Sequence, residues 1–333
     1  MSQLIDTYGR VHSDLRVSLT DRCNLRCTYC MPADFAQWIP GDHLLSAHEI
    51  ISLIDIATQC GIKEVRLTGG EPLLHPEVVE IVHGISQLPL APKLSLTTNA
   101  IKLSELAQPL KDAGLERVNI SLDTLHPDRF LELTKRDRFE QTMQGIAAAK
   151  AAGLSPLKIN TVLMRGHNDD EAVELVKWAM DTGAQLRFIE QMPLDAGGLW
   201  TRDDMISAAD IKVMLEKEFV LTPRDNRGSA PAEEFLIDGG PATVGIIASV
   251  TAPFCSACDR LRLTADGQIR NCLFSTQETD VRAVLRDTDL TPEQKTNRIS
   301  ALFESTTLAK LPGHGINDPS FVQPQRPMSA IGG

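Results

Sequence analysis

The first two thirds of the chain alternate between two hydrophobic patterns. Short runs rich in Val, Ile, Leu and Thr, each bounded by Gly, Asn, Asp or Pro, are typical of strands. We expect six such strands, at Arg16–Thr20, Glu64–Thr68, Lys93–Thr98, Arg117–Asp123, Leu157–Met164 and Gln185–Met192. Apolar positions with the 3.6-residue helical period lie between them, for example over Ser46–Gln59, Ser104–Ala113 and Asp169–Thr182.

The order of these segments predicts an α/β architecture. Six strand–helix units in succession indicate a parallel sheet with helices outside it. Right-handed crossovers in one direction curve such a sheet into a barrel wall. Because eight units would close the barrel, six predict a partial, TIM-like (β/α)6 barrel. The chemistry of such folds lies at the C-terminal ends of the strands, so polar residues there are the candidates for a site.

The pattern changes after about residue 222. Pro223–Ala232 is rich in Pro, Arg, Gly and Ser, which predicts a linker or loop. Short strands are expected next, at Glu234–Ile237, Thr243–Ala248, Leu261–Thr264 and Gln268–Asn271, with the hairpin turn Ala265–Gly267 between the last two. We therefore expect two domains, a partial barrel over residues 1–222 and a smaller α+β domain over residues 223–333.

Composition narrows the function. The net charge of −11 argues against a nonspecific nucleic-acid binder, although a local arginine cluster can still hold one anionic small ligand. No apolar run approaches the roughly 20 residues of a membrane span, and Met1–Arg10 lacks a signal-peptide core. We therefore expect a cytoplasmic protein whose partners include neither nucleic acid nor membrane.

The spacing of the seven cysteines is informative. Because the cytosol is reducing, we do not expect them to form disulfides. Six form two groups of three, and Cys60 is interpreted as a buried helix cysteine without a role.

Cys23, Cys27 and Cys30 form the first group, just after the first predicted strand. Thiolates at this spacing can hold three corners of a four-iron cluster. Three ligands for four irons leave one iron open, which suits the binding and activation of a ligand. A structural zinc site is the alternative, and it would need a fourth ligand such as His43 or His48.

Cys255, Cys258 and Cys272 form the second group, and again three thiolates would leave one iron open to a substrate. A zinc ribbon is the alternative, but its second C-x2-C pair would lack a member. Arg260 and Arg262, two residues apart on a predicted strand, would share a face. Beside a cluster, two such guanidinium groups predict a phosphate clamp rather than a solvated surface pair.

The segment Asp21–Cys30 (DRCNLRCTYC) resembles the signature of the radical SAM superfamily. Over nearly its full length the chain also resembles the GTP 3′,8-cyclase family of molybdenum cofactor biosynthesis. Matching segments include Asp14–Ser18, Arg66–Pro72, Asn119–Asp123, Lys158–Asn160, Phe188–Met192, Ala252–Cys255, Arg262–Gly267 and the terminal Gly332–Gly333. The glycine–glutamate–proline block is general to the superfamily, whereas the second cysteine group, the arginine pair and the diglycine end are specific to the family.

The resemblance implies two [4Fe-4S] clusters and S-adenosylmethionine (SAM) as cofactors, with one cysteine group holding each cluster. The residues implied to contact SAM are Tyr29, Gly70, Ser121 and Met192. The residues implied to bind GTP are Arg16, Arg66, Thr97, Lys158, Arg260 and Arg262, and Arg187 is a further candidate. The tail ending in Gly332 and Gly333 is implied to enter the active site and assist catalysis.

The activity implied by the resemblance is cyclisation of GTP to (8S)-3′,8-cyclo-7,8-dihydroguanosine 5′-triphosphate. It begins with abstraction of the ribose 3′ hydrogen by a 5′-deoxyadenosyl radical. The resemblance also implies an electron donor such as flavodoxin or ferredoxin, the pyranopterin monophosphate synthase as user of the product, and a monomer or homodimer.

Two other readings of the sequence remain open. One is a radical SAM paralogue with two clusters that acts on a different nucleotide or on a peptide. The other is a non-enzymatic iron–sulfur or zinc module, which gives no reason for polar residues at the strand ends. The segment Gln37–Gly41 and Asn271 depart from the family pattern without affecting an assigned residue.

Overall fold

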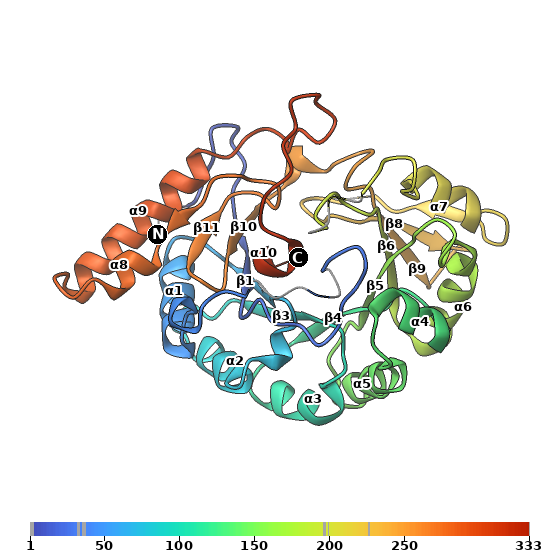
Figure 1. Ribbon diagram of the computed structural model, residues 1–333, viewed down its shortest axis with the longest axis horizontal. Helices are drawn as coiled ribbons and strands as arrows, with labels where there is room; N and C mark the ends of the chain where they lie inside the picture. The colour runs from blue at the N-terminus through green and yellow to red at the C-terminus, as the bar shows by residue number, and fades with distance from the viewer. Residues whose placement is uncertain are drawn as a thin grey trace.

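The computed structural model describes residues 3–31, 34, 38–195, 198, 200–225 and 227–332. Within these residues the strands form one curved sheet in the order β12-β11-β10-β1-β2-β3-β4-β5-β6-β9-β8-β7 (Figure 1). Its centre is a wall of parallel strands: β1 (Asp14–Ser18), β2 (Glu64–Thr68), β3 (Lys93–Thr98), β4 (Arg117–Ser121), β5 (Lys158–Val162) and β6 (Gln185–Ile189). The predicted partial barrel of six parallel strands is confirmed.

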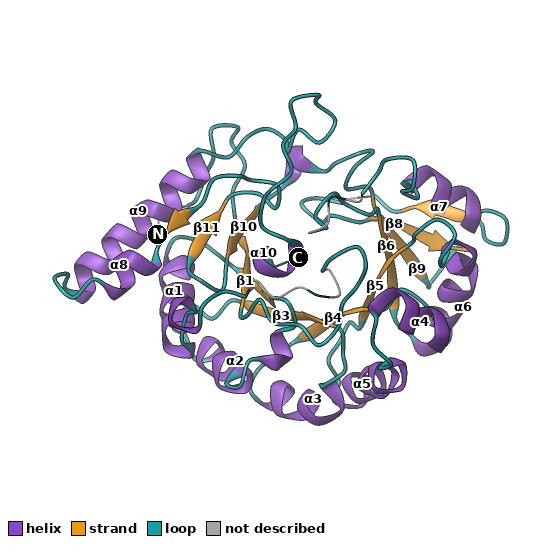
Figure 2. Cartoon of the chain, in the orientation of Figure 1, coloured by secondary structure: helices purple, strands orange, loops and turns teal. Residues whose placement is uncertain are grey.

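Helices cover the outer face of the wall, as Figure 2 shows. They are α1 (Ala47–Gln59), α2 (Val78–Ser86), α3 (Leu103–Asp112), α4 (Pro127–Thr134), α5 (Phe139–Ala151) and α6 (Ala172–Thr182). Ser46 begins α1 with a capping box, in which its side chain accepts from the Glu49 N–H and the Glu49 carboxylate accepts from the Ser46 N–H.

The predicted strand bounds are correct where turn residues flank a buried apolar run. Strands β2 and β3 have the predicted bounds, whereas β1 begins two residues early and β4, β5 and β6 end two to three residues early. The backbone leaves the ladder there to form the loops that carry polar residues. Asp123, predicted to end its strand, instead accepts a hydrogen bond from the Val162 N–H at 2.9 Å.

The strands that follow residue 222 extend the wall at both edges instead of forming a sheet of their own. On one side β10 (Arg260–Leu263) pairs in parallel with β1, and β11 (Gln268–Arg270) and β12 (Thr279–Asp280) follow. On the other side β9 (Thr243–Ile247) pairs in parallel with β6, and β8 (Glu233–Ile237) and β7 (Leu221–Pro223) follow. The domain boundary at residue 222 stays a prediction.

The other helices lie mostly in the last third of the chain. They are α7 (Ala208–Leu215), α8 (Arg282–Arg286), α9 (Pro292–Leu308) and α10 (Met328–Ile331), with the 3-10 turns η1 (Gly41–His43), η2 (Pro72–Leu74), η3 (Asp169–Glu171) and η4 (Cys255–Ala257). Among the described residues, no helix combines the length and the apolar character that a membrane crossing needs.

The two faces of the wall differ because strand side chains alternate. In β1, Leu15 and Val17 are fully buried in the main hydrophobic core, while Arg16 between them lines an interior cavity. In β6, Phe188 lies in the core and Arg187 lines the cavity. The outer face thus stabilises the barrel and leaves the inner face for polar side chains.

Candidate active site

A cavity of about 300 Å³ lies inside the wall. The first cysteine group lies in its lining, as do five arginines from β1, β2, β6 and β10. Phe254 and Leu273, each adjacent in sequence to a cysteine of the second group, also line it. The cavity therefore has a cysteine group at one boundary and direct neighbours of the other group in its wall.

Three arginines lie side by side because of strand register. Arg16 of β1 is paired with Arg66 of β2 on one side and with Arg262 of β10 on the other. Burial lowers the pKa of Arg16 to about 10 and that of Arg262 to about 9, and it lowers the pKa of Arg66 well below its ordinary value. Guanidinium groups remain charged at neutral pH, so this part of the wall favours an anion.

Asp14 is a buried carboxylate beside these arginines. Its Oδ2 lies 3.5 Å from Arg260 Nε and 3.9 Å from Arg16 Nη2. Burial would raise the pKa of Asp14, but the surrounding arginines, Arg16 and Arg66 first, hold it below its ordinary value. One carboxylate does not balance four guanidinium groups, so an excess of positive charge remains for a polyanionic ligand.

The opposite side of the wall adds further cations. Arg187 lines the cavity, with its Nη2 4.0 Å from Glu234 Oε1. Lys158 precedes the cavity-lining Asn160 by two residues and is not itself part of the described lining. Burial, followed by the charge of Arg187, lowers the pKa of Lys158 to about 8. Thr97 lines the cavity between these two sets of cations.

The first cysteine group lies in the loop that follows β1. Cys23, Cys27 and Cys30 are free thiols, and the Cys30 N–H donates to the Cys27 carbonyl at 2.9 Å. Burial raises the pKa of Cys23 to about 11 and that of Cys30 to about 12, and it raises the pKa of Cys27 well above its ordinary value. Without a metal these thiols stay neutral, so metal binding there must release protons.

Gly70 fits closely against this loop. A Cβ at this position would lie 2.4 Å from the Arg22 carbonyl oxygen and 2.5 Å from that of Asp21. The Gly70 N–H also donates to the Thr20 carbonyl at 2.7 Å. A glycine is therefore required for the end of β2 to pack on the cysteine loop.

A buried lysine contacts the second cysteine group at Cys258. Cys255 lies in η4, Cys258 ends that turn, and Cys272 follows β11. Lys310 Nζ lies 3.5 Å from Cys258 Sγ and donates to the Arg260 carbonyl at 2.6 Å. Burial would raise the pKa of Cys258, but Lys310 and Arg260 lower it below its ordinary value. The lowered pKa favours the thiolate of Cys258, which is the form that binds a metal.

The C-terminal tail enters the barrel, and Figure 1 shows the C-terminus at its centre. Met328 and Ser329 of α10 line the cavity, and the Gly332 carbonyl accepts a hydrogen bond from Arg262 Nη1. Gly332 has a φ of +83°, and a Cβ there would lie 2.5 Å from Thr68 Oγ1. Gly333 lies outside the described residues.

Comparison with known proteins identifies the family. The model of the radical SAM superfamily matches residues 17–179, and that of Molybdenum Cofactor Synthesis C matches residues 184–315. A GTP 3′,8-cyclase of Streptomyces coelicolor is 59% identical over 333 residues, covering 99% of this chain and 96% of that protein. The chain belongs to the GTP 3′,8-cyclase family.

Other relatives agree with this family. A GTP 3′,8-cyclase of Mycobacterium sp. strain KMS is 52% identical, covering 99% of this chain and 93% of that protein. Among solved structures, Streptococcus suis SuiB has a TM-score of 0.59 at 14% identity, covering 93% of this chain and 69% of that one. SuiB bound to S-adenosylmethionine has a TM-score of 0.58 at 13% identity, covering 88% and 69%. At this identity the likeness concerns the fold alone.

The predicted SAM residues of this cyclase-family chain all line the cavity. Tyr29, Gly70, Ser121 and Met192 lie in its wall, the last three at or just beyond the ends of strands. Tyr29 Oη donates to Asp123 Oδ2 at 2.7 Å. Burial raises the pKa of Asp123 to about 6 and that of Tyr29 well above its ordinary value. The Tyr29 ring is therefore fixed beside the first cysteine group by Asp123, a carboxylate for which the sequence predicts no role.

Glu71 lies in the glycine–glutamate–proline motif, and the sequence predicts no role for it. It is buried, and its carboxylate accepts from Leu73 N at 3.0 Å, Thr98 Oγ1 at 2.7 Å and Asn99 N at 2.8 Å. Burial raises its pKa to about 7. Glu71 thereby ties the end of β3 to the loop that packs against the first cysteines.

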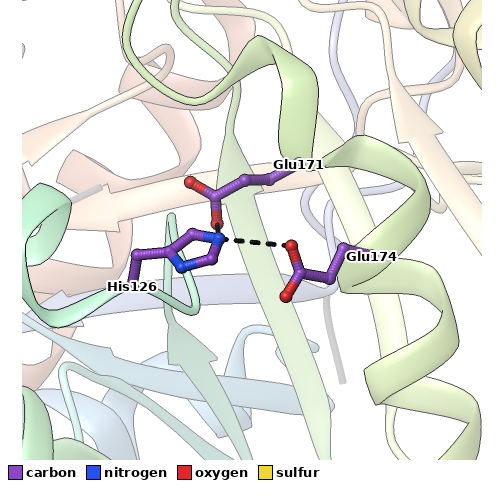
Figure 3. A group of neighbouring side chains, drawn as sticks. All are labelled: His126, Glu171 and Glu174. Atoms are coloured by element: carbon purple, nitrogen blue, oxygen red, sulfur yellow. Dashed lines mark hydrogen bonds and ion pairs between the residues drawn. The ribbon is translucent and has the colours of Figure 1, made fainter.

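A compact group of metal-ligand side chains lies elsewhere, as Figure 3 shows. Among the described residues, His126, Glu171 and Glu174 alone bring three such ligand atoms within 4.8 Å of one another. Glu171 already accepts from Thr124 Oγ1 at 2.7 Å and from Arg129 Nη1 at 2.7 Å. These bonds occupy its carboxylate, and the group anchors the loop before α4 to α6.

The donors at the two cysteine groups suit iron–sulfur clusters. Each group offers three thiols, which can hold three corners of a four-iron cluster and leave one iron open. The radical SAM family to which the chain belongs uses such clusters.

Proposed function

We propose that this chain is a GTP 3′,8-cyclase, which converts GTP to (8S)-3′,8-cyclo-7,8-dihydroguanosine 5′-triphosphate in the first step of molybdopterin biosynthesis. The observation that carries the proposal is the cavity itself. It brings a cysteine group, five arginines and the neighbours of a second cysteine group into one space. The identity of 59% over the full chain supports the same reaction.

The cysteines are proposed to hold two [4Fe-4S] clusters, one on Cys23, Cys27 and Cys30 and one on Cys255, Cys258 and Cys272. When bound, the first cluster and SAM supply the 5′-deoxyadenosyl radical that removes the ribose 3′ hydrogen of GTP. Because burial raises the pKa of Cys23 and Cys30, these thiols would release their protons to solvent when they bind the cluster as thiolates.

The arginines are proposed to hold the triphosphate. Arg16, Arg66 and Arg262 lie on three adjacent strands, so their guanidinium groups can contact successive phosphates without rearrangement. Arg260 is restrained by the Ser229 carbonyl at 2.9 Å and lies over the Phe254 ring at 4.8 Å. A preorganised set of cations loses little entropy on binding, which favours correct placement of the ribose.

Lys158, Thr97 and Arg187 are proposed to complete the GTP site from the other side of the wall. Tyr29, Gly70, Ser121 and Met192 are proposed to contact SAM. The tail is proposed to assist catalysis through Gly332 and Gly333, and the bond from Arg262 to the Gly332 carbonyl supports this role. This hydrogen bond links the C-terminal tail to the arginines that are proposed to bind the triphosphate.

Further parts of the proposal concern partners. The clusters need an electron from a donor such as flavodoxin or ferredoxin, and the product is a substrate for the pyranopterin monophosphate synthase. The proposed compartment is the cytoplasm. Whether the enzyme is a monomer or a homodimer follows from its mass in solution under anaerobic conditions.

The test is an anaerobic assay with SAM, dithionite and GTP that carries deuterium at the ribose 3′ position. Deuterium in 5′-deoxyadenosine together with a cyclised nucleotide is the expected result. SAM cleavage without transfer from GTP would indicate a paralogue with another substrate. No SAM cleavage by protein with eight irons per chain would exclude the enzyme.

A further inference from the structure

Lys310 is a buried cation that neither the motifs nor the proposed reaction uses. It follows α9 and is only 5% exposed. Its Nζ donates to the Arg260 carbonyl at 2.6 Å and lies 3.5 Å from Cys258 Sγ. The ammonium group therefore lies between the second cysteine group and the strand that carries two of the proposed phosphate-binding arginines.

The surroundings of Lys310 do not include a balancing carboxylate. No Asp or Glu forms an ion pair with it among the residues described, and Arg10 adds a second positive charge nearby. A buried ammonium group without an opposite charge is strongly disfavoured. Its two acceptors are the Arg260 carbonyl at 2.6 Å and the Cys258 sulfur at 3.5 Å. Of these, the sulfur carries a negative charge when it is a metal ligand.

We propose that Lys310 is a positioning residue for the second iron–sulfur cluster. It supplies the counter-charge of the thiolates, donates an N–H···S hydrogen bond to Cys258, and joins the cluster to the phosphate clamp through the Arg260 carbonyl. A fixed positive charge favours the more negative, reduced form of a cluster. Lys310 therefore raises the reduction potential of this cluster. The inference rests on the proposed function in one respect, that the second cysteine group holds a cluster.

The test compares three variants. Lys310→Met removes the charge and keeps the length of the side chain, and Lys310→Arg keeps the charge. Lys295→Met is the matched control, because Lys295 Nζ also donates to a backbone carbonyl, that of Leu285 at 2.8 Å, and lies on α9. Each is prepared with Cys23, Cys27 and Cys30 replaced by alanine, so that iron content and the EPR-monitored reduction potential report on the second cluster alone.

We expect the reduction potential of the second cluster to be more negative in Lys310→Met than in the chain that keeps Lys310. Lys310→Arg should show only a small part of this shift, and Lys295→Met should show no shift. Loss of iron in Lys310→Met but not in Lys310→Arg also supports the counter-charge. An unshifted potential with full iron in Lys310→Met overturns the inference. Loss of iron in both Lys310 variants overturns it as well, because the charge would then not be the determining property.

Thermal unfolding separates an electrostatic role from simple packing. In the metal-free chain, Lys310→Met removes an uncompensated buried charge and should leave the unfolding midpoint unchanged or raise it. In the iron-loaded chain the same change should lower it. A decrease in both forms would mean that Lys310 serves only the fold. If the unaltered second group binds no iron, the proposed function fails, whereas a cluster insensitive to Lys310 defeats this inference alone.

Discussion

Replacement of Gly332 by alanine tests whether the docked tail is needed for turnover. Two features oppose an alanine at this position. The φ of +83° is unfavourable for a residue with a Cβ by about 1–2 kcal/mol. The added Cβ would also lie 2.5 Å from Thr68 Oγ1 and 3.1 Å from Ser18 Cβ, an overpacking that costs about 1–3 kcal/mol.

Together these terms destabilise the docked tail by about 2–5 kcal/mol, which reduces the docked population roughly 30-fold or more at about 1.4 kcal/mol per tenfold. We expect Gly332→Ala to lose cyclisation of GTP by a similar factor while it still cleaves SAM. The assay measures both products by chromatography, and hydrogen exchange of Met328–Ile331 reports docking.

Two further variants make the reasoning refutable. Gly315→Ala has a comparable φ of +71° but no atom within 4 Å of its Cβ, so it should keep full activity. Thr68→Ala removes the nearest atom and should partly restore Gly332→Ala. Full cyclisation by a Gly332→Ala chain whose tail exchanges freely would show that docking is unnecessary. An unchanged exchange rate would show that the steric argument is wrong.

Three other predictions concern the wall and the first cysteine loop. Arg16 Nε has no hydrogen-bond partner within the described chain, so it is free to donate to a phosphate, and Arg16→Gln should weaken GTP binding by about 1–3 kcal/mol. Calorimetry that finds the same affinity for GTP in this variant would show that Arg16 does not bind the phosphates. Gly70→Ala should displace the first cysteine loop and halve the iron content, and a full complement of iron would contradict the close packing. The pKa of Glu71 is raised to about 7 by burial, so its contribution to stability is fully present below pH 4.5 and is lost as the pH rises to about 7. Metal-free protein should therefore lose about 3 kcal/mol relative to Glu71→Gln over that range, measured by denaturant unfolding, and parallel pH profiles would refute it.

The local pattern predicted the six central strands well. Strands β2 and β3 have fully predictable ends because Gly, Asn or Pro follows or precedes a buried apolar run. The last third was harder. All four strands predicted there form, but their partners are set by tertiary packing, and nothing local indicates that Asp14 is paired with Arg260.

The candidate site divides in a similar way. The cysteines were found by spacing, and the arginines, Gly70 and Gly332 by resemblance, whereas composition alone favours a disordered tail. Lys310 lies in no motif, and Asp14 lies in a family segment without a predicted role; their burial beside other charges identifies both. The segment Pro223–Ala232, predicted as a linker or loop, contributes Pro231 to the cavity lining, a contact that composition cannot indicate.

The pairing of β1 with β10 bears on how the protein is made. Ser13 and Asp259, which contact each other at the start of this pair, are 246 residues apart. At about 5–20 residues per second, roughly 10–50 s separate the emergence of these two strands from a ribosome. During that interval the edge of β1 that later pairs with β10 has no strand beside it, and exposed strand edges favour aggregation. The set of arginines on β1, β2 and β10 is therefore complete only after β10 has been synthesised.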